Sequence, residues 1–105
     1  MRRRAALAIL AGAALLAAAA PKHAVHVVTI SGLSYTPAVL TARVGDEVRW
    51  VNHDIFLHSA TATDKSFDVT LKPHGSGQVV LRHPGVVTYI CRYHPGMKGQ
   101  IVVRK

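Results

Sequence analysis

The chain has 105 residues, half of them hydrophobic, a single cysteine and a formal net charge of +8 at neutral pH. This length supports one small domain, and a single cysteine excludes a disulfide within the molecule. The basic side chains are spread along the chain and form no cluster of the kind that binds nucleic acid. We therefore expect no nucleic-acid partner and interpret the charge as a surface that attracts acidic partners.

The first twenty residues are typical of a secretory signal peptide. Three arginines at positions 2–4 precede an apolar run that ends at Ala20 in small residues. The run is short and rich in alanine, which favours a cleaved signal over a membrane span, with an uncleaved N-terminal anchor as the alternative. We expect residues 1–20 to be removed and residues 21–105 to form one exported domain in the periplasm, without stable membrane insertion.

After Pro21 the sequence reads as short strands separated by turn residues. Stretches rich in β-branched residues end at Gly32, at Gly45 and before the turn at residues 83–85, and no stretch has a convincing helical periodicity. We expect about eight strands, at residues 25–31, 39–44, 47–52, 58–63, 67–71, 78–82, 86–91 and 100–104, with a loop at 72–77. Short strands with this spacing predict an all-β, single-domain β-sandwich or barrel.

The most informative segment reads C-R-Y-H-P-G-M at positions 91–97. Cys91 lies at the end of a predicted strand, and the Pro-Gly pair favours a tight turn that brings His94 and Met97 back toward it. A thiolate, an imidazole and a thioether at one point form a soft ligand set that suits copper. Structural zinc sites use cysteine and histidine rather than methionine, which disfavours zinc. A buried, inert cysteine is the other alternative, but it does not explain His94 and Met97 at their spacings.

A fourth ligand has to come from another strand, and residues 52–59 offer two histidines. His58 opens a predicted strand, so the sheet can fix its position, whereas His53 lies in a loop beside Asp54 and fits an exposed side chain. With a second histidine the set becomes two His, one Cys and a weak axial Met, the arrangement of blue-copper electron-transfer sites. The remaining histidines have no partner pattern and are interpreted as surface residues: His23, His26, His74 and His83.

Four stretches of the chain together match the pattern of one known family. They are G-D-E-V-R-W-V-N from Gly45, L-H-S-A-T from Leu57, S-F-D from Ser66, and G-V-V-T-Y-I-C-R-Y-H-P-G-M-K-G from Gly85. On these stretches, residues 29–105 resemble the small type I (blue) copper proteins, the plastocyanin and amicyanin branch of the cupredoxin family. The two-residue gaps between cysteine, histidine and methionine are the short-loop version that is typical of amicyanin.

The resemblance implies an eight-stranded Greek-key sandwich and one-electron transfer between redox proteins. It implies four copper ligands, which are His58, Cys91, His94 and Met97. Two positions depart from the family pattern, because Leu57 stands where proline is frequent and Ser59 where asparagine is frequent. That asparagine usually links the two ligand loops by hydrogen bonds, so the reduction potential of relatives does not carry over to this chain.

The resulting hypothesis is an exported carrier that binds one type I copper ion and cycles between Cu(II) and Cu(I). We expect no enzymatic activity, because the ligand set is filled and the chain offers no second metal cluster for a substrate. The resemblance implies that redox partner proteins dock at an exposed His94 face with Leu57, Pro95 and Gly96, and we expect a monomer. A periplasmic copper-binding or delivery protein is the alternative. A secreted interaction module would require coincidence at four positions.

Overall fold

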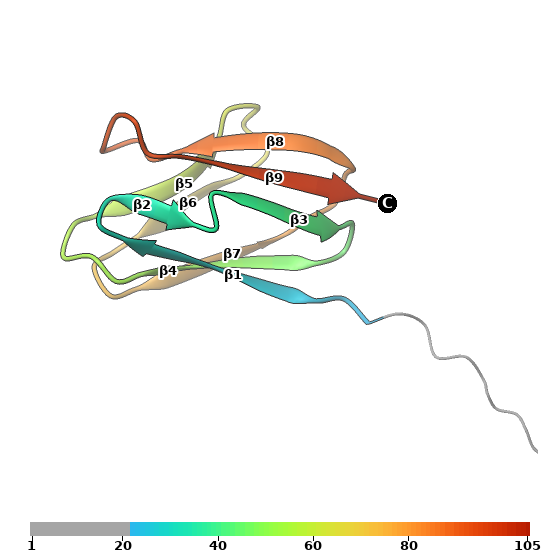
Figure 1. Ribbon diagram of the computed structural model, residues 1–105, viewed down its shortest axis with the longest axis horizontal. Helices are drawn as coiled ribbons and strands as arrows, with labels where there is room; N and C mark the ends of the chain where they lie inside the picture. The colour runs from blue at the N-terminus through green and yellow to red at the C-terminus, as the bar shows by residue number, and fades with distance from the viewer. Residues whose placement is uncertain (1–21) are drawn as a thin grey trace, which may run out of the picture.

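The computed structural model describes residues 22–105, which form a β-sandwich of two sheets (Figure 1). The nine strands of this part are β1 (Val25–Ser31), β2 (Ser34–Thr36), β3 (Val39–Arg43), β4 (Glu47–Asn52), β5 (His58–Ala62), β6 (Asp68–Leu71), β7 (Ser76–Val80), β8 (Gly85–Ile90) and β9 (Lys98–Arg104). Within residues 22–105, no helix has the length and hydrophobicity that a membrane span requires. The predicted signal peptide, residues 1–20, lies outside the described residues. The all-β sandwich is confirmed.

The strand pairing brings two loops to one end of the sandwich. One sheet has the order β2-β1-β4-β7 and the other the order β3-β9-β8-β5-β6. Because β8 runs antiparallel to both β5 and β9, the end of β8 lies near the starts of its two neighbours. The loop at residues 91–97 and the loop at residues 53–57 therefore lie at the same end, on the left in Figure 1. We call this the loop end.

The core lies between the sheets and follows the predicted alternation along the strands. Val48 and Trp50 in β4 and Ile101 and Val103 in β9 are at most 4 % exposed. The Trp50 ring meets the buried Tyr89 ring edge-on, with 5.3 Å between centroids. Aromatic pairs of this geometry contribute about 0.5–1.5 kcal/mol beyond the burial of their area. The two rings thus fill the core next to the loop end.

The strand count, the position of one strand and the ends of several others differ from the expectation. Strand β2 was not predicted, because its three residues are too short to give a pattern and form only as a hairpin partner of β1. Strand β7 begins at Ser76, inside the predicted loop 72–77, and ends at Val80 rather than at residue 82. Gly77, which suggested a loop, lies opposite Trp50, and a side chain there would collide with Val69. The glycine is therefore a packing requirement within a strand.

Gly99 in β9 is a second position where packing excludes a side chain. It lies directly opposite Tyr89 in β8, and a methyl group on Gly99 would overlap the phenol ring, which is fully buried. We expect Gly99→Ala to lower the free energy of unfolding by about 1–3 kcal/mol, as overpacking does, measured by urea denaturation. Gly32→Asn is the control, because open space surrounds Gly32 and asparagine tolerates its φ of 60°. Equal stability of the two variants would contradict this packing argument.

Candidate metal centre

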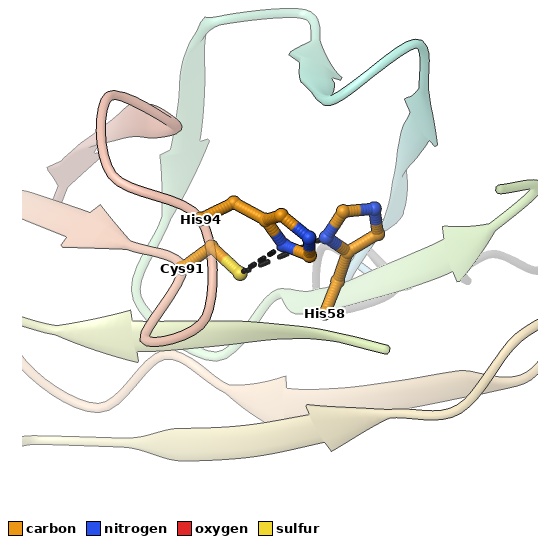
Figure 2. Close-up of side chains that lie close together, drawn as sticks. All are labelled: His58, Cys91 and His94. Carbon is orange, nitrogen blue, oxygen red and sulfur yellow. Dashed lines mark hydrogen bonds between the residues drawn. The ribbon is translucent and has the colours of Figure 1, made fainter. Parts of the chain in front are cut away.

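Three of the predicted ligands meet at the loop end (Figure 2). His58 opens β5, Cys91 directly follows β8, and His94 lies in the next loop. The Cys91 Sγ atom is 3.7 Å from His58 Nδ1 and 3.6 Å from His94 Nδ1. Donors at these separations fit one first-row metal ion with bonds of about 2.0–2.3 Å. A thiol sulfur with two imidazole nitrogens is also the donor chemistry that copper prefers, so the residues fit a copper ion.

The structure distinguishes the two histidines that precede β5. His58 is fully buried and belongs to the group with Cys91 and His94, whereas His53 is exposed and lies outside it. The backbone N–H of His53 donates to the carbonyl oxygen of Ile30 at 2.8 Å, which ties this residue to β1. His94 is half-buried, and its ring centroid is 4.6 Å from that of His58. The site thus has one buried and one partly exposed imidazole.

Met97 closes the loop that carries Cys91 and His94. The N–H of Met97 donates to the carbonyl oxygen of His94 at 3.3 Å, and the N–H of Cys91 donates to that of Met97 at 3.2 Å. Pro95 and Gly96 occupy the middle of this turn, and Gly96 has a φ of 93°, as a type II turn requires. The predicted tight turn is confirmed, and it places Met97, which is 4 % exposed, in the buried layer of the site.

Ser59 links the two ligand loops despite its departure from the family pattern. Its backbone N–H donates to Cys91 Sγ at 3.4 Å, and its Oγ accepts the N–H of Arg92 at 2.9 Å. Ser59 is fully buried, and its bond to the sulfur is buried, whereas the bond from Arg92 is partly buried. Hydrogen bonds from neighbouring groups orient the ligands of a metal site. The serine therefore makes the connection that the sequence analysis left open.

Asn52 organises the loop at residues 53–57, and the sequence analysis missed this role. Its Nδ2 donates to the carbonyl oxygens of Phe56 (2.8 Å), Leu71 (3.1 Å) and Lys72 (3.2 Å). Its Oδ1 accepts the N–H of Asp54 at 2.9 Å. The available signal was the position of Asn52, two residues after Trp50 on the inward face of β4. A polar residue on that face needs buried partners.

The carboxylate of Asp54 is the second group that the sequence analysis overlooked. It accepts hydrogen bonds from the backbone N–H of Gly32 at 2.8 Å and of Leu33 at 3.0 Å. It accepts a third hydrogen bond from His58 Nε2 at 2.8 Å. The hydrogen bond from Leu33, with further contributions from His58 and Gly32, holds the pKa of Asp54 below its usual range. Asp54 is therefore ionised at neutral pH, directly behind a proposed ligand.

His26 corrects the interpretation of the remaining histidines as unpartnered surface residues. Its Nε2 donates to Asp46 Oδ2 at 2.8 Å, and Asp46 also accepts the backbone N–H groups of Ala24 and Arg43, each at 3.0 Å. The bond from Ala24, followed by those from His26 and Arg43, lowers the pKa of Asp46 to about 2. This pair precedes β4, at the end of the sandwich opposite the loop end, and has a structural role.

Exposed apolar residues lie at the same end of the sandwich as the partly exposed imidazole. The loop residues Ile55, Phe56 and Leu57 are 74 %, 48 % and 38 % exposed, and the Phe56 ring lies edge-on to His94 with 5.7 Å between centroids. Together with exposed Pro95 they form a surface that we call the His94 face. The sequence analysis placed Leu57 and Pro95 there and missed Ile55 and Phe56. Three consecutive apolar residues in a loop were the available signal.

Comparison with known proteins agrees with this fold and donor set. The sequence profile of the family described as cupredoxin-like domain matches residues 4–103. Amicyanin-alpha of Methylorubrum extorquens is 30% identical over 82 residues, which cover 72% of this chain and 69% of that protein. A Cu(I) form of an amicyanin variant is 27% identical with a TM-score of 0.70, over 75% of this chain and 81% of that one. A reduced Cu(I) form of another variant at pH 4 is 26% identical with a TM-score of 0.69, over 82% and 86% of the two chains.

Proposed function

This chain belongs to the cupredoxin-like family, and we propose that it is a type I copper protein that carries single electrons between redox proteins. The observation that carries the proposal is the group of His58, Cys91 and His94, whose thiol sulfur lies 3.6–3.7 Å from both Nδ1 atoms. Such a set with a weak axial thioether is the ligand arrangement of blue-copper electron-transfer sites.

We propose that Met97 would hold the copper ion together with these three residues. Its burial and its place at the closing position of the ligand loop support the assignment. A bound copper ion would supply one-electron Cu(II)/Cu(I) chemistry. The chain holds the donors in place through the sheet, through Ser59 and through the turn at His94, so that they move little between the two oxidation states.

The buried position of the site favours a carrier over a delivery protein. His58 is 0 % and Cys91 is 4 % exposed, which favours retention of the ion, whereas a delivery protein has to release it. The test is to titrate the purified protein with Cu(II) and to record absorption spectra and cyclic voltammograms. We expect an intense thiolate-to-copper band that saturates at one equivalent, and a reversible one-electron wave with copper retained over repeated cycles. Release of copper on reduction would favour delivery, and a colourless protein would contradict the blue-copper assignment.

The proposed function includes a location in the cell. We infer that residues 1–20 are a signal peptide and that residues 21–105 act in the periplasm, on the pattern of three arginines followed by an apolar run. Mass spectrometry of the exported protein is expected to give a mass that lacks about the first twenty residues. A full-length mass in the exported fraction would contradict cleavage.

We propose that redox partners dock on the His94 face. Electron self-exchange between the oxidised and reduced protein tests this without a known partner, and nuclear magnetic resonance line broadening measures its rate. We expect Phe56→Lys to slow self-exchange by about 10-fold, because two basic molecules would then meet through like charges at the point of contact. Val86→Lys is the matched control, since Val86 is 61 % exposed and lies at the opposite end of the sandwich. Equal slowing by both variants would contradict docking at the His94 face.

A further inference from the structure

Asp54 connects two segments that are distant in the sequence. Its Oδ1 accepts the N–H of Gly32 at 2.8 Å and its Oδ2 accepts the N–H of Leu33 at 3.0 Å. Both donors lie in the turn between β1 and β2, where their φ angles of 60° and 61° give a tight turn. The carboxylate is therefore fixed by the backbone of the β1–β2 hairpin, independently of any side chain that it contacts.

The same carboxylate meets His58 on the side of the ring that faces away from Cys91. The His58 Nε2 atom is 2.8 Å from Asp54 Oδ2, while His58 Nδ1 is 3.7 Å from Cys91 Sγ. A neutral imidazole carries its proton on one nitrogen and a lone pair on the other. An ionised carboxylate only accepts hydrogen bonds, so the proton lies on Nε2. The lone pair of Nδ1 then faces the sulfur.

We propose that Asp54 is a positioning residue that fixes the ring orientation and the tautomer of His58 before any metal binds. The inference rests on the proposed function, in which His58 is a ligand. A metal requires the lone pair of the ligating nitrogen, and a fixed partner on the other nitrogen supplies it in the correct direction. His94 has no such carboxylate partner within residues 22–105. The two histidines are thus held in different ways, one by a fixed charge and one by its loop.

The chain contains a matched control for this device. Asp46 accepts two backbone N–H groups and His26 Nε2 at 2.8 Å, which repeats the hydrogen bonds of Asp54 at the opposite end of the sandwich. Asp46→Ala therefore removes the same number and kind of bonds as Asp54→Ala, and both variants lose stability. Only Asp54→Ala changes the surroundings of His58.

The experiment compares the two alanine variants with the unchanged protein in two measurements. Long-range ¹H–¹⁵N correlation spectra of the metal-free protein, recorded at mildly alkaline pH where imidazoles are neutral, identify the protonated nitrogen of each histidine. Competition titration gives the affinity for Cu(II). We expect a single Nε2–H tautomer of His58 in the unchanged protein and in Asp46→Ala. We expect mixed tautomers in Asp54→Ala, with an affinity that is about 10–100-fold lower, as loss of such a partner typically costs.

A second variant, Asp54→Asn, keeps the test possible if Asp54→Ala does not fold. Asp54→Asn keeps the size of the side chain and one acceptor oxygen, so its affinity is expected between those of the unchanged protein and of Asp54→Ala. A single Nε2–H tautomer with unchanged affinity in the Asp54 variants would overturn the inference, as would an equal effect of Asp46→Ala on His58. If the unchanged protein binds no copper, the proposed function fails, while the tautomer comparison still decides the role of Asp54.

Discussion

Replacing Cys91 with serine is expected to abolish the visible absorption of the copper-loaded protein. The band arises from charge transfer between the thiolate and copper, and a serine hydroxyl is a hard, protonated donor that gives no such transition. The loss of affinity for Cu(II) is expected to exceed the roughly 10–100-fold that removal of an outer partner costs, because a direct ligand is lost. Absorption spectroscopy and competition titration on the same samples measure both effects. A band that survives in Cys91→Ser would contradict the ligand assignment.

The two histidines before β5 provide a matched pair for the same measurement. His58→Ala is expected to lose the band as well, because the Nδ1 atom 3.7 Å from Cys91 Sγ disappears. His53→Ala is expected to keep both the band and the affinity, since His53 is exposed and lies outside the group. The two variants remove the same side chain five positions apart. An equal loss in both would indicate a general effect on the loop rather than a ligand.

Local patterns in the sequence predicted the parts of the fold that local residues determine. Strands β1 and β4 have the predicted bounds, because their β-branched and alternating residues indicate an extended chain with one buried face. The inward positions of Val48 and Trp50 follow from the same alternation. The ligand loop was predictable since its chemistry and its turn residues lie within seven positions.

The features that the sequence did not predict depend on contacts between distant segments. β2 exists as the partner of β1, and the glycine in β7 is explained only by Val69, which lies in β6 of the other sheet. Asp54 was recorded only as a neighbour of His53, because its donors in the β1–β2 turn lie 21 and 22 positions away. Hydrogen bonds of this kind leave no periodic signal in a single sequence. They nevertheless decide how the buried histidine is held.

Replacing Asn52 with alanine is expected to give a large loss of stability, about 3 kcal/mol or more. The side chain is fully buried, and its amide donates to the carbonyl oxygens of Phe56, Leu71 and Lys72 while it accepts the N–H of Asp54. The carbonyl oxygen of Lys72 keeps its hydrogen bond from the N–H of Gly75. A buried group that loses its only partner costs about 1–3 kcal/mol. Urea denaturation of the metal-free protein measures the effect directly.

Two further variants separate the chemistry of this amide from its size. Asn52→Asp keeps the shape but replaces the donor by oxygens that face carbonyl oxygens, so we expect it to be at least as destabilised as Asn52→Ala. Gln78→Ala is the control, because that amide is exposed and accepts one surface hydrogen bond from Arg49, and we expect a change within about 0.5 kcal/mol.

The bonds of Asn52 also hold Asp54 and Phe56, so its loss should weaken copper binding together with stability. An Asn52→Asp variant as stable as the unchanged protein would contradict the role of the amide as a donor, and unchanged copper affinity in Asn52→Ala would separate the loop from the site.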